Sequence, residues 1–167
     1  MRVSTYTLVA SAFAFTASAA SAFAITASAA ISEAKAPYCP PRPASIHEQR
    51  EIFYEFNKKL LIDYNSTSAI MDHVAEDYIQ HNPLTLSGRD RALSDFAFIS
   101  PDTVNFTVFR QGVDANIGYV HVRMHLAGDA RPMAVVDLFR FNGSCIQEHW
   151  GVVMEQPANS TNPLPMW

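Results

Sequence analysis

The stretch 135-VVDLFRFNGSCIQEHWGVV-153 holds two apolar runs on either side of Asn142-Gly143. Asn-Gly between such runs is the strongest short-range signal for a β-hairpin, because both residues tolerate the positive φ of a two-residue turn. Each run also carries one carboxylate, Asp137 in the first and Glu148 in the second. The hairpin therefore predicts two acids within strands that otherwise have the composition of a core.

The register of the hairpin decides where these two acids lie. With Asn142-Gly143 as the turn, counting outward sets Asp137 opposite Glu148 and Val135 opposite Trp150. Directly opposed residues share one face of a sheet, so the two carboxylates are predicted to be neighbours on the concave face. A bulged turn would shift the register by one residue and set Asp137 opposite Gln147 instead.

The predicted acid pair has apolar surroundings. Strand residues that alternate with polar ones share the concave face, and the expected wall of the hollow is Tyr78, Val122, Met124, Val135, Phe139, Ile146 and Trp150. Two carboxylates in an apolar hollow are not both ionised cheaply, so one keeps its proton and the pair can donate and accept protons. The alternative is a structural pair that is buried and hydrogen-bonded.

The rest of the chain predicts an α+β fold. Ser45 and Glu48 form a capping box that begins a helix over 45–62, and two shorter helices are expected over about 66–74 and 88–99. The segment between these two, "AEDYIQHNP", is expected to be extended because proline disfavours a helical conformation in the residue before it. Four strands are then expected, over about 103–111, 117–127, 132–141 and 144–154.

The first part of the chain has the composition of a targeting segment. One Arg and then a long run of small and apolar residues predict a signal peptide over 1–30, cleaved after Ala24 or near Ala30. A membrane anchor is the alternative, but no basic flank follows the run. Four prolines make 31–44 a predicted linker, and the domain is expected to span 45–167. The mature protein is therefore expected to be secreted, with no membrane contact after the signal is removed.

The predicted secretion makes glycosylation and disulfide formation relevant to this chain. Four N-glycosylation sequons begin at Asn65, Asn105, Asn142 and Asn159. In an oxidising compartment, Cys39 and Cys145 are able to form a disulfide. The alternative is that Cys145 is a half-buried thiol and Cys39 is free.

Composition excludes several classes of partner. The chain of 167 residues has a net charge of −4 and only 17% charged residues, which is not the surface of a nucleic-acid-binding protein. It has no Gly-rich phosphate loop. His121 and His125 are separated by about 13 Å on a strand, too far to share one ion. We therefore expect neither a metal nor a cofactor.

The convex face of the predicted sheet is polar with two aliphatic residues. It is expected to carry His121, Arg123, His125, Val136, Leu138, Arg140, Gln147 and His149. A monomer would leave the aliphatic side chains in water, whereas a two-fold dimer through this face would bury them. The sequence therefore predicts a homodimer.

Three segments of the domain resemble a known family. "DYIQHNPLTLSG" (77–88), "AVVDLFRFNGSCIQEHW" (134–150) and "NSTNPLPMW" (159–167) are similar to segments of SnoaL-like proteins, described as polyketide cyclases and aldol-condensation enzymes. The order of helices and strands resembles the nuclear transport factor 2-like cone. Gly151 stands where the family commonly has Asp after Glu-His-Trp, which removes one candidate acid.

The resemblance implies a hydrophobic pocket between sheet and helices, with polar groups at its floor. His81, in the "QHNP" loop, becomes a third candidate for proton transfer beside Asp137 and Glu148, although it can instead hold its turn. We expect a cofactor-free acid/base enzyme, a cyclase, isomerase or dehydratase, acting on a lipophilic small molecule. The alternative is a non-catalytic binder that uses the same pocket or the convex face, since the fold alone does not give function.

Overall fold

The structure, a computed structural model, describes residues 35–162 and 166–167, so the predicted signal peptide over 1–30 lies outside the described residues. In chain order the elements are α1 (Ile46–Asn57), the π-helical turn η1 (Lys58–Ile62), α2 (Ser66–His73), β1 (Val74–Gln80), α3 (Arg89–Asp95), β2 (Val104–Asp114), β3 (Ile117–Leu126), β4 (Met133–Asn142) and β5 (Cys145–Glu155).

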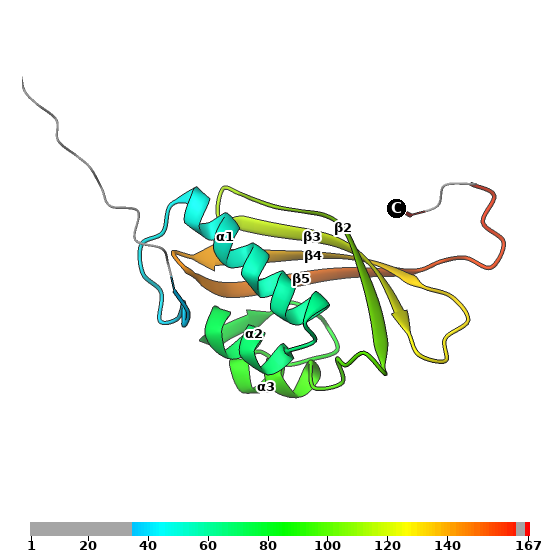
Figure 1. Ribbon diagram of the computed structural model, residues 1–167, viewed down its shortest axis with the longest axis horizontal. Coiled ribbons are helices and arrows are strands. Elements are labelled where there is room, and N and C mark those ends of the chain that lie inside the picture. The colour runs from blue at the N-terminus through cyan, green and yellow to red at the C-terminus, as the bar shows by residue number, and fades with distance from the viewer. Residues whose placement is uncertain (1–34, 163–165) are drawn as a thin grey trace, which may run out of the picture. The chain divides into compact units, whose positions relative to one another are not determined.

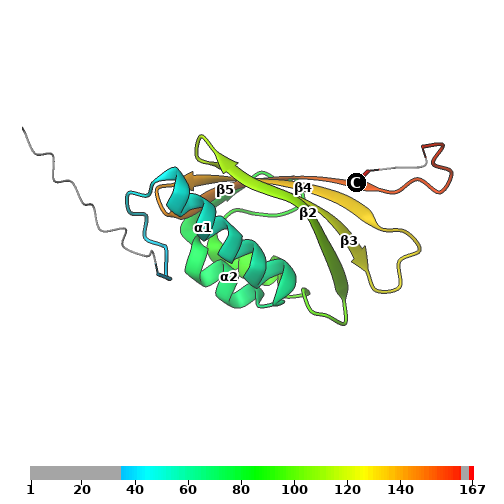
Figure 2. The ribbon, with the colours of Figure 1, turned by 45° about the horizontal axis from the view of Figure 1, so that its top comes forward.

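The five strands form one curved sheet in the order β1-β5-β4-β3-β2. β1 runs parallel to β5, and the other neighbours are antiparallel. Figures 1 and 2 show α1 and α2 on one face of this sheet. The predicted α+β class is therefore confirmed, with one addition. The segment expected only to be extended is a fifth strand, and its parallel pairing gives β5 a second hydrogen-bonded neighbour.

The first helix begins where the sequence predicted. The Ser45 side chain accepts a hydrogen bond from the Glu48 amide, and the Glu48 carboxylate accepts one from the Ser45 amide. These two bonds satisfy backbone donors that a helix N-terminus otherwise leaves free. One face of the helix is buried and presses Phe53 and Phe56 against Phe139 of β4. This contact joins the helical layer to the sheet.

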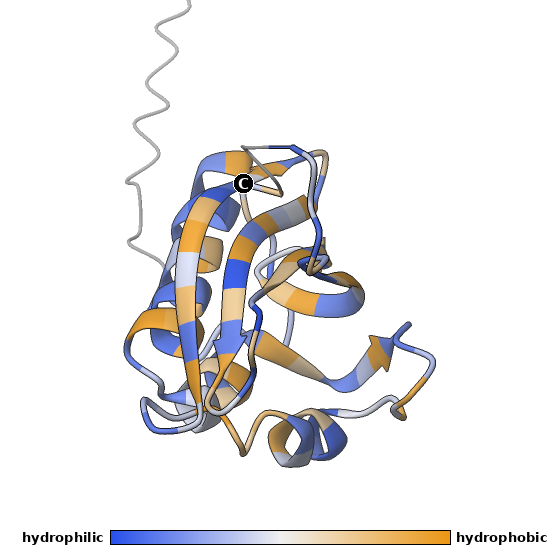
Figure 3. Cartoon of the chain, turned by 90° about the vertical axis from the view of Figure 1, so that its right-hand side faces the viewer, coloured by the Kyte–Doolittle hydropathy of each residue, from blue (hydrophilic) through white to orange (hydrophobic). Residues whose placement is uncertain are grey.

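Hydrophobic and hydrophilic residues alternate along the strands (Figure 3). The concave face therefore carries the core side chains, and Val120, Val122 and Phe139 are each at most 4% exposed there. Gly118 also lies on this face, where an added Cβ would come within 3.0 Å of the Phe53 ring. Glycine at 118 thus permits close packing between helix and sheet.

The register of the β4–β5 hairpin differs from the prediction. Asn142 pairs with Cys145, Gln147 has no partner in the β4 ladder, and Asp137 pairs with Gly151. Gln147 forms a bulge, and its side-chain Nε2 donates to the backbone oxygen and to Oδ1 of Asp77 in β1, at 3.2 and 3.0 Å. One extra residue in a strand exchanges the faces of all residues beyond it. The predicted pairing of Asp137 with Glu148 is therefore wrong.

The bulge also changes the predicted convex face. His121, Arg123, His125, Arg140, Val136 and Leu138 have the alternation and exposure expected of it. His149 pairs with Phe139 and lies on the concave face instead. Gln147 is hydrogen-bonded to β1 and does not contribute to the convex face. Both residues are therefore corrections to the prediction.

The hairpin turn is fixed by a segment from the start of the domain. Gly143 has φ +56°, and an added Cβ would lie 2.1 Å from the Arg42 carbonyl oxygen, so only glycine fits. That carbonyl accepts a hydrogen bond from the Ser144 amide at 2.9 Å. The Gln49 side chain of α1 donates to the Gly143 carbonyl at the same distance.

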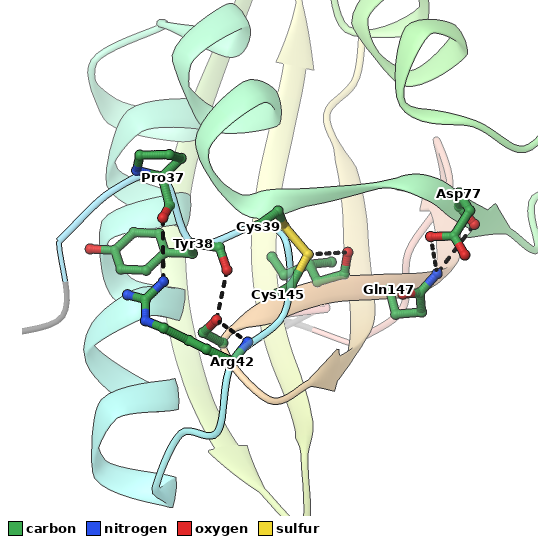
Figure 4. The surroundings of a disulfide bond; sticks show 9 residues. Pro37, Tyr38, Cys39, Arg42, Asp77, Cys145 and Gln147 are labelled. Carbon is green, nitrogen blue, oxygen red and sulfur yellow. Dashed lines mark hydrogen bonds between the residues drawn. A yellow bond between two sulfur atoms is a disulfide. The ribbon is translucent and has the colours of Figure 1, made fainter.

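The Pro-rich segment is part of the folded domain. Cys39 forms a disulfide with Cys145 at the first residue of β5, which decides between the two alternatives for the cysteines (Figure 4). Tyr38 is 3% exposed and belongs to the core, and its carbonyl accepts a hydrogen bond from Ser144 Oγ at 2.6 Å. Residues of the segment predicted to be a linker over 31–44 therefore pack with the domain whose start was predicted at residue 45. The segment packs because its cysteine and its aromatic ring both have buried partners.

Within the described part of the chain, no helix is long and apolar enough to cross a membrane. The four sequon asparagines, Asn65, Asn105, Asn142 and Asn159, are all exposed. Asn65 also caps α2, since its Oδ1 accepts a hydrogen bond from the Ser68 amide at 3.0 Å.

Buried His73 predicts that the fold is sensitive to acid. Its ring lies between the rings of Tyr38 and Phe56, and burial, followed by the charge of Lys59, lowers its pKa from 6.5 to about 4. Between these two pH values, His73 is therefore protonated in the unfolded chain and neutral in the folded one. Stability falls as pH drops from about 6.5 to about 4, by roughly 3 kcal/mol for this group.

Urea unfolding at pH 7 and pH 4.5 measures this loss. His73→Gln keeps a polar side chain that does not titrate, and we expect its stability to depend less steeply on pH. Glu55 and Asp72 contribute their own acid dependence to both proteins, because Lys59 lowers the pKa of each carboxyl. The difference between the two proteins therefore isolates His73. Equal pH slopes would contradict the assignment.

Candidate functional site

A cavity of about 280 Å³ lies between the concave face and the helical side of the domain. Most of its wall is aliphatic or aromatic, and the polar exceptions come from β1, β4, β5, α3 and the loop after β1. The wall is formed by Leu60, Leu61, Gln80, Asn82, Thr85, Asp95, Phe96, Phe98, Ile99, Phe106, Val122, Met124, Val135, Asp137, Phe139, His149, Gly151 and Val153.

Asp137 and His149 form a pair in this wall. His149 Nε2 lies 3.0 Å from Asp137 Oδ1, with side chains 7% and 23% exposed. The two residues lie on adjacent strands and face the same way because the bulge at Gln147 turned His149 inward. A carboxylate and an imidazole in contact can hold a proton between them and pass it to a bound molecule.

Gly151 makes room for this pair. It stands directly opposite Asp137, and an added Cβ would lie 2.8 Å from Asp137 Oδ1 and 3.4 Å from the His149 ring. Any side chain at 151 would therefore displace the carboxylate, the imidazole or both. Glycine at position 151 thus leaves the space that the Asp137–His149 contact needs.

A hydrogen-bonded chain continues behind the pair. His149 Nδ1 lies 3.0 Å from Gln80 Oε1, which also accepts a bond from the Asn82 amide at 3.0 Å. Gln80 Nε2 donates to the Tyr78 hydroxyl at 3.3 Å. Burial, with the charges of Asp137 and Asp95, raises the pKa of the Tyr78 phenol. Tyr78 therefore stays protonated at neutral pH.

A second polar group lies elsewhere in the cavity wall. Asp95 forms an ion pair with Arg91 at 2.8 Å and accepts a hydrogen bond from the Thr85 hydroxyl. No Lys or Arg is among the described residues of the wall. An anionic ligand would therefore find no basic side chain in this wall, most of which is apolar.

Glu148, predicted to be the second acid, lies outside the cavity. Its Oε1 accepts a hydrogen bond from Arg140 Nε at 2.8 Å, and its Oε2 lies 3.0 Å from His81 Nε2. These two bonds, from Arg140 first, lower the pKa of the Glu148 carboxyl. His81 stacks on Trp150 with ring centroids 4.4 Å apart. The structure thus brings His81 and Glu148 together, but on the convex face and away from Asp137.

The predicted wall residues are distributed over three places. Val122, Met124, Val135 and Phe139 lie in the wall of the cavity. Tyr78 is buried behind it and reaches it through Gln80, whereas Ile146 lies in the hydrophobic core. Trp150 stands with Glu148 on the convex face because of the bulge.

Sequence reasoning missed His149 and Gln80. For Gln80 a signal was present, since Tyr78 and Gln80 share a face of an extended segment and His81 points the other way. If Tyr78 lines the pocket, the same alternation predicts that Gln80 lies at the pocket and that His81 does not. For His149 the alternation itself was misleading, because the bulge cannot be read from the strand. Within residues 35–162 and 166–167, no group of three or more His, Cys, Asp or Glu side chains could hold a metal ion.

The chain is similar to a known family in sequence and to known proteins in structure. The profile of the SnoaL-like domain family matches residues 55–149. No curated protein sequence matches the chain. Among solved structures, a proposed ketosteroid isomerase from Kribbella flavida is similar with a TM-score of 0.56 and 17% identity, over 72% of this chain and 86% of that one.

Two proteins of unknown function show the same likeness. An NTF2-like protein from Mesorhizobium loti has a TM-score of 0.56 and 21% identity, over 68% of this chain and 97% of its own. An NTF2-like protein from Burkholderia xenovorans has a TM-score of 0.57 and 14% identity, over 70% and 91%. These likenesses show a shared nuclear transport factor 2-like fold.

Proposed function

The chain belongs to the SnoaL-like domain family, and on this premise we propose that it is a cofactor-independent acid/base enzyme for a lipophilic small molecule. The reaction is an isomerisation, cyclisation or dehydration. The observation that carries the proposal is the contact between Asp137 and His149 in the wall of an otherwise apolar cavity. Asp137 and His149 replace the predicted trio of Asp137, Glu148 and His81.

The chemistry follows from the groups at the cavity. Asp137 removes a proton from a carbon next to a carbonyl, or from a hydroxyl, and His149 takes up or returns the proton shared with Asp137. The protein returns a proton at a second position of the ligand, so that no oxidant or reductant is consumed. A bound ligand and the apolar wall together would exclude water from the pair, which would strengthen its interaction with the charge that develops on the ligand.

Hydrogen exchange tests this proposal before a substrate is identified. A panel of neutral lipophilic ketones is incubated with the protein in D₂O, and deuterium uptake next to the carbonyl is followed by mass spectrometry. We expect uptake with at least one compound, and its loss in Asp137→Asn. Binding of ketones without any protein-dependent uptake would contradict the enzymatic proposal.

The second candidate function is a non-catalytic binder. It is favoured by the predominance of apolar side chains in the cavity wall, which would hold a hydrophobic ligand without any proton transfer. In that case Asp137→Asn would change the affinity for the ligand, and no ketone would exchange deuterium.

We also propose that the protein is secreted and glycosylated. The disulfide between Cys39 and Cys145 is typical of an oxidising compartment, and all four sequon asparagines are exposed. Mass spectrometry of protein recovered from the medium of a secreting eukaryotic host tests signal cleavage and glycan occupancy together. A protein that stays inside the cell with its first 30 residues intact would contradict this proposal.

The partner that we propose is a second copy of this chain, bound through the convex face. Tyr119, Val136, Leu138 and Val152 are 43%, 39%, 39% and 68% exposed there, beside the charged cluster around Glu148. We expect light scattering at tens of micromolar to give a dimer mass, and Leu138→Lys to give a monomer. Leu84→Lys, in the loop after β1, is the control for an added charge. A monomeric wild-type domain would contradict the proposal.

A further inference from the structure

We propose that Gln80 is a positioning residue that fixes the tautomer of His149. In this arrangement Nδ1 keeps its hydrogen, and only Nε2 exchanges a proton with Asp137. The catalytic meaning of this arrangement rests on the proposed function, but the arrangement itself concerns the ligand-free protein. Neither Gln80 nor His149 was expected to be part of the site.

The orientation of the Gln80 side chain is fixed by its neighbours. The Asn82 amide can only donate a hydrogen bond, and it lies 3.0 Å from the atom assigned as Gln80 Oε1. A rotated amide would set Nε2 against this N–H, with two donors facing each other. The correct orientation also lets Gln80 Nε2 donate to the Tyr78 hydroxyl.

The orientation of Gln80 determines the hydrogen on His149. Gln80 Oε1 can only accept, and His149 Nδ1 lies 3.0 Å from it. Nδ1 must therefore carry a hydrogen. The histidine ring is also held in place, because it stacks on Phe139 with ring centroids 4.6 Å apart.

The remaining nitrogen then has one role. His149 Nε2 and Asp137 Oδ1, 3.0 Å apart, would repel each other if both presented lone pairs. One proton between them removes the repulsion, as an imidazolium–carboxylate pair or as a neutral imidazole with a carboxylic acid. Both forms have zero net charge, which suits a cavity whose described wall contains no Lys or Arg. The pair thus carries one transferable proton.

Loss of the acceptor at position 80 would release this constraint. The neutral ring could then move its hydrogen from Nδ1 to Nε2 and donate it to the Asp137 carboxylate, the tautomer that a nearby carboxylate normally selects. Gln80→Met removes the acceptor at similar length. Gln80→Glu keeps an oxygen for both the Asn82 amide and His149 Nδ1, and it serves as the matched control.

Nitrogen NMR of ¹⁵N-histidine-labelled protein tests the assignment without any ligand. The titration is followed in wild type, Gln80→Glu and Gln80→Met, with His149→Gln to assign the signals. Tyr78 and Asp95, the other titratable residues of the hydrogen-bonded chain and of the described cavity wall, are retained in all the variants, whereas Gln80→Glu adds a carboxyl group beside His149 Nδ1. We expect Nε2 to lose its proton in wild type and in Gln80→Glu, and Nδ1 to lose it in Gln80→Met.

Two outcomes would overturn the inference. One is a wild-type protein in which Nδ1 of His149 loses its proton first. The other is a folded Gln80→Met variant with the wild-type tautomer. The wild-type measurement alone is decisive if the methionine variant does not fold. A confirmed tautomer in a protein that exchanges no deuterium into any ketone would leave this inference standing and contradict the proposed function alone.

Discussion

Replacement of Asp137 by Asn is expected to slow deuterium exchange, and turnover of the true substrate, by about 10²–10⁴-fold. An amide neither accepts nor donates a proton at a useful pH, so the pair with His149 loses its transferable proton. The measurement is the initial rate of deuterium uptake at equal protein concentration. A rate within a few-fold of wild type would remove Asp137 from the mechanism.

The variant should fold normally, which separates a chemical effect from a structural one. Asn and Asp are nearly the same size, and the amide can turn either its oxygen or its nitrogen toward His149 Nε2. The contact at 3.0 Å therefore keeps a donor and an acceptor in each protonation state of the ring. We expect a melting temperature within a few degrees of wild type.

Glu148→Gln is the matched control for this experiment. It makes the same chemical change at the acid that was predicted to act with Asp137. Glu148 lies on the convex face with Arg140 and His81, so the exchange rate should stay at the wild-type value. A large loss of exchange in this variant, with its fold intact, would show that the convex face takes part in the chemistry.

The parts of the fold that could be predicted from sequence depend on local rules. The capping box at Ser45 and the existence of the strands β2 to β5 each follow from patterns of a few neighbouring residues. β1 was predicted only to be extended, because its partner β5 is about 70 residues away and parallel pairing leaves no turn in the sequence.

The faces of β5 could not be predicted by the same rules. Period two assigns faces only relative to a starting residue, and the bulge at Gln147 resets that start. At the bulge, Gln147 bonds to Asp77, in a strand that alternation alone did not connect to this hairpin. The error exchanged Glu148 for His149 in the site, while Asp137, before the turn, was unaffected.

Another contact that local patterns left undecided joins the N-terminal Pro-rich segment to the β4–β5 hairpin, and removing it should produce the largest loss of stability. Cys39 and Cys145 are 106 residues apart in the sequence. A crosslink over such a loop restricts the unfolded chain by about 4–5 kcal/mol in the chain-entropy account. We expect the double variant Cys39→Ser, Cys145→Ser to melt roughly 10–20 °C lower than wild type.

The double variant should still reach the same fold. The Tyr38 amide donates to the Asp72 carbonyl at 2.6 Å, and the Arg42 carbonyl accepts from the Ser144 amide, so the segment keeps bonds to both α2 and the hairpin. The deuterium exchange rate at 25 °C should therefore be close to that of wild type. Wild-type protein that is unfolded, reduced and refolded under reductant should have the same melting temperature as the double variant. A double variant that melts within a few degrees of the oxidised wild type would show that these non-covalent contacts alone hold the segment.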